Sequence, residues 1–496
     1  MNWRNGCSSC PMSSRNYEKR EACGVVAAYS YKHKPVANAI YLALLAQQHR
    51  GQDGAGIAVV EGDSIELQKG MGLVTDAITR EFVAGLNGWL GVGSVRYPTT
   101  GTPSAKDAQP FIVSDIRGGM ANSHNGNLVN YHQMRALVQK EGRALSSKCD
   151  CEIIVDVFAE ALRKNKGDFF KAAEYCMKTF DGAYCEGLVT GKGELFAFRD
   201  PHGIKPLCYG WNDELFMVAS ESVCLDINKI PMKGFVAPGS ALLLKDGKLT
   251  LKQLVNARFA TCMFEYVYFS RPDSNLDAGN VYQIRLKLGE LLARDAPAKA
   301  DVVVPMPDTA RPAAEGYARK SGIPFLEGLI KNRYVGRTFI MPQQRDREAA
   351  VRVKFNPLRS LLKGKRVVLI DDSIVRGTTT SIIVRLLKEG GAKEVHVRIT
   401  CPPIVGPCFY GIDMSTHKEL IGANHSVEEI RKMLGADSLA YQTIGAMNEA
   451  IGLKADQMCN GCLHEDYPTP LAKKVNAILK GGSSEKRYWE EATMVH

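Results

Sequence analysis

The chain has 496 residues, which is more than one hydrophobic core accommodates, so we expect two to four domains. Its composition, 45% hydrophobic and 23% charged, is that of a globular protein. No apolar run reaches the roughly 18 residues of a membrane-spanning helix, and the charged N-terminal segment lacks the apolar region of a secretory signal. These features argue against a membrane or secreted protein and predict a soluble, cytoplasmic one.

The formal net charge of +10 is concentrated in one stretch of the chain. Residues 331–366 contain eleven Lys or Arg against two acidic residues. A solvated basic face or a nucleic-acid patch would be the ordinary interpretations. Because aromatic residues are sparse there and no nucleic-acid module is recognisable, a polyanionic small substrate fits at least as well.

The first half of the chain alternates short strand patterns with a few helical ones. Residues 1–22 are polar and irregular, and the pattern changes abruptly at Cys23 to a short strand followed by an apolar helix at 37–49. Gly-rich turns separate further strands, which we expect at residues 56–62, 90–97, 194–200, 214–220 and 239–244. This arrangement predicts an α+β domain built on antiparallel sheet up to about residue 255.

The second half has the pattern of a parallel sheet. Continuous apolar strands at 301–307, 366–372 and 394–400 alternate with helices at 310–322 and 379–391. Strands of this kind, joined through helices, are typical of a sheet covered on both faces. After Pro470 the chain turns polar, and we expect residues 471–496 to be peripheral.

One loop of the second half has the features of a phosphate site. The strand Val367–Ile370 runs into Asp371-Asp372 and then into Ser373-Ile-Val-Arg-Gly377-Thr-Thr-Thr380, which opens a helix. Gly377 permits a tight turn, and the unpaired N–H groups of a helix N-terminus favour a phosphate. The two carboxylates suit vicinal ribose hydroxyls or a magnesium ion.

The segment VVLIDDSIVRGTTT resembles the phosphoribosyl-pyrophosphate (PRPP) motif of type I phosphoribosyltransferases. The resemblance implies that the acidic pair engages the ribose and that the following loop holds the 5-phosphate. The PRPP-binding residues are then Asp371, Asp372, Ser373, Ile374, Val375, Arg376, Gly377, Thr378 and Thr379. Mg²⁺ would lie near Asp371, Asp372 and Thr309, and Lys331–Ile340 resembles the mobile loop that closes over PRPP and excludes water.

Four segments of the first half carry a second resemblance. CGVVA at Cys23, QHRGQDGAG, VRYPTTG and HNGNL follow one another and are similar to the class II, N-terminal-nucleophile glutamine amidotransferases. A cysteine thiolate can attack a carboxamide if a local base takes up its proton. Removal of residues 1–22 as a propeptide would supply that base, because the freed α-amine of Cys23 titrates near about pH 8.

The same resemblance implies roles for other residues. The Asn125 side chain and the Gly126 N–H would form the oxyanion hole, and Arg96 would bind the α-carboxylate of glutamine. Asp150 aligns with the carboxylate that receives the α-ammonium, although the family usually carries serines where this chain has Cys149 and Cys151. The alternative is that this cysteine pair is a surface feature without catalytic meaning.

Both halves occur in this order in the glutamine PRPP amidotransferases, the family that carries out the first step of de novo purine synthesis. The resemblance predicts a propeptide (1–22), an αββα N-terminal-nucleophile glutaminase domain (23–255), an α/β phosphoribosyltransferase domain (256–470) and a tail (471–496). It implies that ammonia released at Cys23 passes through an internal channel to PRPP. It further implies feedback inhibition by purine nucleotides and a homotetramer or homodimer, with no nucleic-acid partner.

The fourteen cysteines divide into groups. In a cytoplasmic chain they are core residues, ligands or nucleophiles rather than disulfides, and we expect Cys176, Cys185, Cys208, Cys224 and Cys401 to serve packing. Four others, Cys262, Cys408, Cys459 and Cys462, could hold zinc or an iron–sulfur cluster, since four thiolates satisfy either. These four match the cluster ligands of the family's iron–sulfur branch, and that resemblance selects [4Fe–4S]. The Cys7-x-x-Cys10 pair is expected to be incidental.

Two other classes of protein remain as alternatives. A regulator that binds PRPP without catalysis would need the Asp371–Thr379 loop but not Cys23 or Arg96. A sugar-phosphate aminating enzyme would keep the first half and lack the PRPP segment. The chain contains both sets of residues, which favours the two-site enzyme.

Overall fold

Two antiparallel sheets stacked face to face form the first domain in a computed structural model that describes residues 23–62, 64–97, 104–114, 118–332, 351–414 and 416–481. The predicted propeptide, most of the predicted PRPP-covering loop, Cys7, Cys10 and residues 482–496 lie outside the described residues. Small and β-branched residues fill the space between the sheets, among them Ala27, Val92, Ala121 and Val218.

The first sheet has the order β11-β9-β10-β1-β4-β2-β3. Its strands are β1 (Gly24–Ser30), β2 (Gly54–Glu61), β3 (Ser64–Met71), β4 (Leu90–Arg96), β9 (Cys208–Trp211), β10 (Leu215–Ala219) and β11 (Met232–Phe235). The second sheet has the order β13-β12-β8-β7-β6-β5. Its strands are β5 (Phe111–Val113), β6 (Met120–Leu128), β7 (Gly182–Thr190), β8 (Leu195–Arg199), β12 (Ser240–Lys245) and β13 (Lys248–Gln253).

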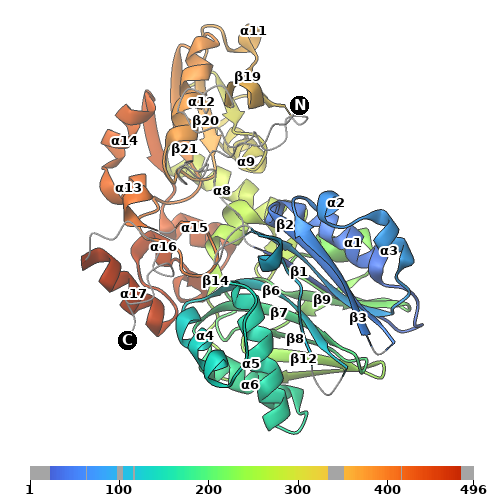
Figure 1. The fold of residues 1–496 in the computed structure, drawn as a ribbon. Helices are drawn as coiled ribbons and strands as arrows, with labels where there is room; N and C mark the ends of the chain where they lie inside the picture. The colour runs from blue at the N-terminus through green and yellow to red at the C-terminus, as the bar shows by residue number, and fades with distance from the viewer. Residues whose placement is uncertain are drawn as a thin grey trace, which may run out of the picture.

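Helices cover the outer face of each sheet, which completes the predicted αββα layering (Figure 1). The first sheet is covered by α1 (Ala37–Ala46), α2 (Val74–Ala77), α3 (Arg80–Gly85) and α7 (Val223–Ile227). The second is covered by α4 (Tyr131–Lys140), α5 (Asp150–Lys164) and α6 (Phe169–Thr179). The hydrophobic face of α5 packs on β6 and β5, and its Phe158 stacks with Phe198 of β8.

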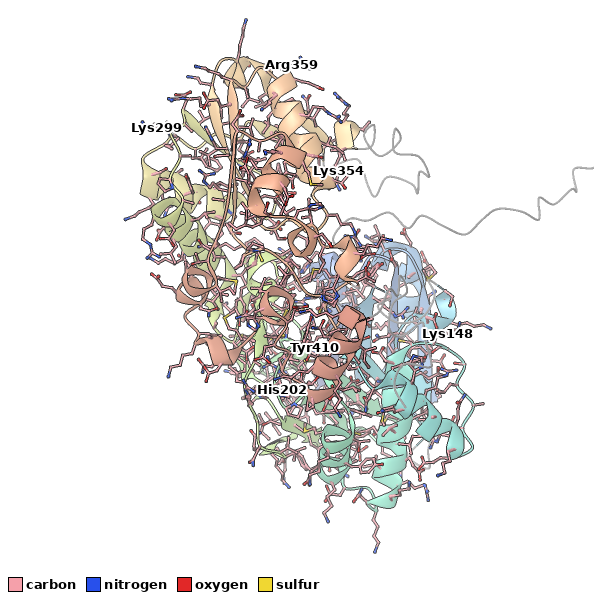
Figure 2. All side chains as sticks on the ribbon, turned by 90° about the vertical axis from the view of Figure 1, so that its left-hand side faces the viewer. Lys148, His202, Lys299, Lys354, Arg359 and Tyr410 are labelled. Carbon is pink, nitrogen blue, oxygen red and sulfur yellow. The ribbon has the colours of Figure 1, made fainter. Side chains whose placement is uncertain are left out.

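The second domain is built on a four-stranded, wholly parallel sheet of order β17-β20-β21-β22, as the continuous apolar strands predicted. The strands are β17 (Val302–Pro305), β20 (Arg366–Asp371), β21 (Glu394–Ile399) and β22 (Ser438–Tyr441). The helices are α8 (Val281–Asp295), α9 (Arg311–Ser321), α12 (Thr378–Glu389), α14 (Val427–Leu434) and α15 (Ile444–Ile451), with α11 (Arg359–Leu362) and α13 (Ile421–Asn424) as short turns. Figure 2 shows Lys299, Lys354 and Arg359 around this domain, the last two within the basic stretch.

The end of the described chain returns to the first domain (Figure 1). Strand β23 (Met458–Cys459) pairs in parallel with β14 (Thr261–Cys262), and α16 (Gly461–His464) and α17 (Pro470–Gly481) follow. Ala472 and Val475 of α17 are buried in the core, and the Leu471 N–H donates to Asp181 of the first domain at 3.1 Å. The expectation that the tail is peripheral from residue 471 is therefore wrong for residues 471–481, because an amphipathic helix buries its apolar side there.

A buried ionic network joins the two domains. Arg50, which is fully buried, donates to Glu221 of the first domain and to Glu265 of η3 (Glu265–Phe269), a π-helical turn at the start of the second. Ser270 accepts from Arg50 at 3.0 Å and donates to Glu265 at 2.9 Å. Lys205 lies 3.5 Å from the other Glu265 oxygen. Removing one partner from such a network leaves a buried charge uncompensated, which costs about 3–5 kcal/mol.

Helices α8 and α9 approach closely because each has a glycine at the contact. A Cβ on Gly289 would lie 1.8 Å from the carbonyl oxygen of Ala313, and one on Gly316 would lie 2.0 Å from that of Leu286. Backbone atoms block both positions, so a side chain at either would force the helices apart.

We therefore predict that Gly289→Ala destabilises the second domain by about 2–3 kcal/mol, because the methyl group overpacks the helix contact. The matched control is Gly445→Ala in α15, where a Cβ meets nothing within 4 Å. That variant should match the parent or gain up to about 1 kcal/mol from the reduced flexibility of the unfolded chain. Thermal denaturation of both variants measures the difference, and equal midpoints would contradict the packing argument.

Candidate active site

Cys23 lies at the beginning of β1 and is 4% exposed. Its thiol points to the carbonyl oxygen of Tyr97, 3.6 Å away. Strands β1 and β4 are antiparallel with Gly24 opposite Val95, so Arg96 at the end of β4 is brought beside Cys23. Burial raises the pKa of the Cys23 thiol, and the nearby Arg96 and His124 charges only partly oppose this effect. The thiol is therefore protonated at neutral pH unless a local base accepts its proton.

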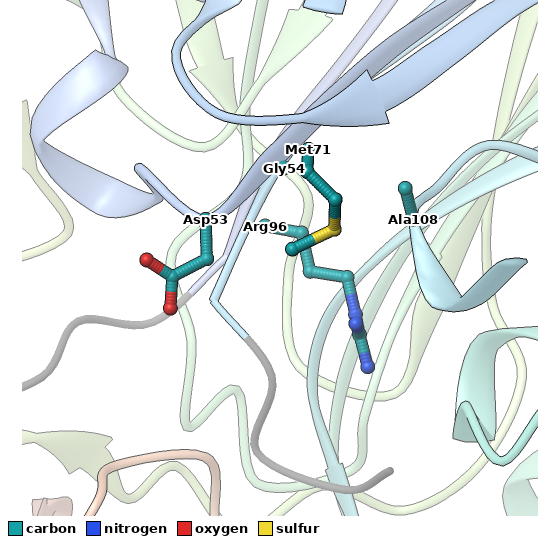
Figure 3. A pocket seen from close by; sticks show the side chains of 5 residues that line it. All are labelled: Asp53, Gly54, Met71, Arg96 and Ala108. Atoms are coloured by element: carbon teal, nitrogen blue, oxygen red, sulfur yellow. The ribbon is translucent and has the colours of Figure 1, made fainter. Parts of the chain in front are cut away.

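A small pocket borders Arg96, which the pairing of β1 with β4 places beside Cys23 (Figure 3). It is lined by Asp53, Gly54, Met71, Arg96 and Ala108. The Arg96 side chain extends between Met71 and Ala108, and Asp53 lies at the opposite side of the opening (Figure 3). A buried guanidinium at the wall of a small pocket suits a carboxylate ligand, as predicted for Arg96.

Asp150 sits in the first turn of α5 and belongs to a buried charged cluster. Its carboxylate accepts the Leu128 N–H at 3.2 Å and lies 3.4 Å from Nε2 of His124. The other ring nitrogen of His124 pairs with Glu186 at 2.5 Å, and Asn122 donates to the second Glu186 oxygen at 3.1 Å.

The charges in this cluster stabilise one another. Burial opposes ionisation of Asp150, but the His124 and Arg96 charges and the Leu128 N–H outweigh it and lower the Asp150 pKa. Burial likewise disfavours the imidazolium of His124, yet Glu186 and Asp150 raise its pKa well above the usual value. Asp150 is therefore held as a carboxylate, the form that an ammonium ligand requires.

The cysteines on either side of Asp150 are both buried, so the interpretation of this pair as a surface feature is wrong. The Cys149 Sγ lies 3.7 Å from a carboxylate oxygen of Asp150, and burial raises its pKa to about 12. A protonated thiol at this position can act as a weak hydrogen-bond donor to Asp150. It occupies the place where a serine hydroxyl would serve the same purpose.

Asn125 and Gly126 lie on β6, close to the start of β1. The hydroxyl of Ser220 accepts the Val25 N–H at 3.0 Å and the Asn125 side-chain amide at 3.4 Å, so it connects the two strands. Gly126 has φ of 148°, and a Cβ there would fall 1.9 Å from the Ala183 carbonyl oxygen. Only glycine fits this position, because any Cβ would collide with the neighbouring strand.

The predicted phosphate loop lies at the carboxyl end of β20, the edge where ligands of open α/β sheets bind. Asp371 and Asp372 are 6% and 5% exposed, and Ser373 donates to Asp372 at 2.7 Å. Gly377, with φ of 77°, precedes the first turn of α12, where Thr378 is exposed and Thr379 is half-buried. This is the geometry of an anion site at a helix N-terminus.

Three of the predicted PRPP residues differ in environment from the rest. The side chains of Ile374 and Val375 are buried in the core, so only their backbone groups could serve a ligand. Arg376 is paired with Glu419 at 2.8 Å.

Thr309 follows β17, which neighbours β20, and is half-buried. Lys331 ends β18 (Leu329–Lys331), which pairs with β19 (Phe355–Pro357), and it forms an ion pair with Asp308 at 3.1 Å.

The structure brings the four predicted cluster cysteines together in one buried region. Cys262 and Cys459 are register partners in the β14–β23 pair. Cys408 accepts the Tyr410 N–H at 3.4 Å, and Cys462 follows in α16. Within the described ranges, no group of three or more His, Cys, Asp or Glu side chains is arranged around a single metal position.

A buried lysine beside these thiols supports an anionic ligand there. The Lys205 ammonium is fully buried and, within the described part of the chain, has an ion-pair partner in Glu265 but no hydrogen-bond acceptor. It lowers the pKa of Cys262 and Cys408, although burial dominates and raises both. Metal binding displaces thiol protons, so these residues fit a thiolate-ligated group of net negative charge.

Sequence reasoning did not identify Asp53, His124, Glu186 or Lys205. His124 is part of the HNGNL segment, but a single histidine in a strand does not by itself indicate a role in a site. Glu186 could have been identified from the sequence, because an acidic residue in the apolar strand Gly182–Thr190 is expected to have a charged or hydrogen-bonding partner. Lys205 could not have been identified in this way, since its partner Glu265 is far away in the sequence.

Two family models match the chain, a glutamine amidotransferase domain over residues 99–226 and a phosphoribosyl transferase domain over residues 277–404. The amidophosphoribosyltransferase of Methanothermobacter thermautotrophicus is 47% identical over 462 residues, which cover 92% of this chain and 97% of the relative. That of Bacillus subtilis is 41% identical and covers 91% and 95%. The chain belongs to the amidophosphoribosyltransferase family. The family prediction, the fold class and the two-domain architecture are confirmed.

Solved structures agree with this amidophosphoribosyltransferase assignment. Glutamine PRPP amidotransferase from B. subtilis, in complex with ADP and GMP, has a TM-score of 0.83 at 40% identity, over 90% of this chain and 98% of that one. A structure described as the allosteric regulatory enzyme of purine biosynthesis has a TM-score of 0.84 at 39% identity and covers 90% and 97%. Among the helices that the structure describes, none combines the length and apolarity needed to cross a bilayer.

We predict that His124→Leu destabilises the folded protein by about 3–5 kcal/mol at neutral pH, because Glu186 would remain buried without its cation. Burial already raises the Glu186 pKa, and loss of the opposing His124 charge would raise it further above that of the unfolded chain. The folded variant would bind protons that the unfolded chain does not, so its deficit should shrink as the pH falls from 7 to 5.

Denaturant titrations at several pH values measure this dependence. His425→Leu, at an exposed position, is the control and should show no such effect. A deficit that is independent of pH would contradict the charge-cluster interpretation.

Proposed function

We propose that this chain transfers the amide nitrogen of glutamine to PRPP, giving 5-phosphoribosylamine, pyrophosphate and glutamate, the first step of de novo purine biosynthesis. The observation that carries the proposal is the presence in one chain of two sites. The first contains Cys23 with the charges of Arg96 and Asp150 beside it, and the second is the Asp371–Thr379 loop at a helix N-terminus. A regulator would not need the first site, and a sugar-phosphate aminating enzyme would not need the second.

In the glutaminase half, glutamine binds with its α-carboxylate on Arg96 and its α-ammonium on Asp150. Cys23 attacks the carboxamide carbon and forms a thioester, and ammonia leaves. The Asn125 side-chain N–H and the Gly126 N–H donate to the oxygen that becomes negative in the tetrahedral intermediate. A single donor of this kind contributes roughly 10²–10³-fold in rate.

Removal of residues 1–22 is part of the proposal. The raised pKa of the buried Cys23 thiol supports it, because the thiol then needs a base within reach. Once the preceding peptide bond is cleaved, the α-amine of Cys23 accepts the thiol proton and later returns it to the leaving ammonia.

In the transferase half, PRPP binds with its ribose on Asp371 and Asp372 and its 5-phosphate on the backbone N–H groups and hydroxyls of Ser373–Thr379. Mg²⁺, when bound, would neutralise the pyrophosphate that departs, with Thr309 and the two aspartates as the candidate residues. The basic residues between 331 and 366 would concentrate the anionic substrate at this edge. Ammonia that passes internally from Cys23 then attacks C1 of the ribose.

We further propose that Cys262, Cys408, Cys459 and Cys462 hold a [4Fe–4S] cluster with a structural role. The convergence of the four thiols and the buried charge of Lys205 support an anionic thiolate-ligated group. The complex of the B. subtilis relative with ADP and GMP supports feedback inhibition of this chain by purine nucleotides. Assembly as a homodimer or homotetramer and a cytoplasmic location complete the proposal.

Cys23→Ala is predicted to lower glutamine-dependent synthesis by at least about 1000-fold while ammonia-dependent synthesis continues, because only the first site loses its nucleophile. Cys176→Ala is the matched control, since that cysteine is buried in α6 and belongs to neither set of predicted site residues, and it should retain both activities. Parallel assays with glutamine or an ammonium salt measure the split.

Equal loss of both activities in Cys23→Ala would refute the two-site scheme. The intact mass of the parent protein tests the nucleophile assignment separately. A chain that keeps residues 1–22 and hydrolyses glutamine at full rate would rule out the α-amine as the base.

Cys459→Ser is predicted to abolish binding of the cluster, because one of its four ligands is lost. Anaerobically purified parent protein should contain about four iron and four sulfide per chain and absorb broadly in the visible range. Cys401→Ser, a buried cysteine outside the ligand set, should keep the parent's iron. Stoichiometric zinc in the parent, without iron, would overturn the cluster assignment in favour of the zinc alternative.

A further inference from the structure

The segment from Cys408 to Gly411 lies directly against the end of β6, the strand that carries Asn125 and Gly126. A Cβ on Gly411 would fall 2.9 Å from the carbonyl oxygen of Gly126 and 3.1 Å from its carbonyl carbon. Gly411 also has φ of 101°, a conformation that L side chains rarely adopt. The two glycines are therefore in backbone contact across nearly 300 positions of sequence.

A hydrogen bond reinforces the same contact. The side-chain amide of Asn127 donates to the carbonyl oxygen of Phe409 at 3.0 Å, and both residues are buried. The segment therefore contacts the Gly126 carbonyl group directly and holds the side chain of the next residue, Asn127. The Gly126 N–H belongs to the preceding peptide unit, and the Gly126 φ of 148° sets its direction relative to the carbonyl group that Gly411 contacts.

The supporting segment is itself fixed by the region around the four cysteines. The Cys408 N–H donates to Met414 at 2.7 Å, and the Tyr467 hydroxyl donates to the Pro407 carbonyl at 2.7 Å. The Tyr410 hydroxyl is hydrogen-bonded to Thr469 at 3.0 Å. Figure 2 shows Tyr410 where the second domain meets the first.

A second connection returns from the C-terminal region to the first domain. The Leu471 N–H donates to the Asp181 carboxylate at 3.1 Å, and the Asp181 carbonyl accepts the Val129 N–H at 2.8 Å. Residues 125–129 are thus held from two directions by parts of the chain that also surround Cys408 and Cys462.

We propose that the segment Phe409–Gly411 is a positioning element for the oxyanion hole of the glutaminase site. It restricts the Gly126 backbone through the contact of Gly411 with the Gly126 carbonyl and through the hydrogen bond from the Asn127 side chain to Phe409, and it acts through Gly126 rather than on a substrate. The proposal rests on the assignment of Asn125 and Gly126 as oxyanion donors. It also gives the four-cysteine site an effect on glutamine hydrolysis, because Cys408 begins the segment that supports those donors.

The test is Gly411→Ala, whose methyl group would push against Gly126. Glutamine hydrolysis should fall about 100-fold in kcat with little change in KM, because a donor to the transition state is displaced while glutamine binding is untouched. Ammonia-dependent synthesis, the iron content and the rate of Cys23 alkylation by iodoacetamide should all match the parent. General destabilisation would lower both activities together.

Gly452→Ala is the matched control, because Gly452 has φ of 81° but a Cβ there meets nothing within 4 Å. Like Gly411→Ala, this variant places a side chain at a positive φ, but it makes no contact with Gly126. It should therefore leave the ratio of glutamine-dependent to ammonia-dependent activity unchanged. Asn127→Ala is the second variant, since it removes the hydrogen bond to Phe409 from outside the cysteine-bearing segment. It should lower glutamine hydrolysis selectively even if Gly411→Ala folds poorly or loses iron.

Asn125→Ala distinguishes an error in the oxyanion-hole assignment from an error in the positioning proposal. If it leaves glutamine hydrolysis intact, the oxyanion-hole assignment of the proposed function is wrong. If it lowers hydrolysis while Asn127→Ala does not, the positioning role of Phe409–Gly411 is refuted and the proposed function stands.

Discussion

The fully buried guanidinium of Arg50 determines how the two halves of the chain fit together. It lies between Glu221 of the first domain and Glu265 of the second. Among the residues that the structure describes, no other basic side chain comes as close to either carboxylate. Burial disfavours its charge, but the two carboxylates outweigh burial and raise the Arg50 pKa. A charged group removed from water has few tolerable positions, so the network permits one relative placement of the domains. Both chemical sites depend on that placement.

The two sites use different physical means to hold anions and cations. In the glutaminase half, the charges are buried side chains, and Asp150, His124 and Glu186 fix one another in a water-poor environment where electrostatic effects are strong. In the transferase half, the loop after β20 offers backbone N–H groups and half-exposed hydroxyls at a helix N-terminus. The first arrangement suits a small zwitterion that must be oriented closely. The second suits a large polyanion that enters from solvent.

The site could be predicted best from the sequence where its residues lie next to one another in the chain. Asp371-Asp372 and the Thr-rich turn are adjacent residues, and the strand, turn and helix that present them follow from apolar runs and Gly377. Cys23, Arg96 and Asn125 were identifiable because each lies in a short family-like segment. Strand and helix positions in both domains followed from hydrophobic patterning, since each element buries one side or the whole of its length.

The site residues and the helix that could not be predicted depend on contacts between residues far apart in the sequence. His124 and Glu186 are partners across 62 positions, and Lys205 meets Glu265 across a domain boundary. Nothing in a local window distinguishes such residues from other charged ones. The helix at Pro470–Gly481 was misjudged for a related reason, because its charged side is evident in the sequence and the surface that receives Ala472 is not.

The return of the C-terminal region to the first domain has a consequence for protein synthesis. A ribosome completes residues 23–255 long before it reaches Cys408, Thr469 or Leu471, yet these later residues hold the strand that carries Asn125 and Gly126. A nascent glutaminase domain therefore lacks its support until the acceptor domain has been made. If Phe409–Gly411 positions the oxyanion hole as proposed, the order of translation delays glutamine hydrolysis until the acceptor domain is present.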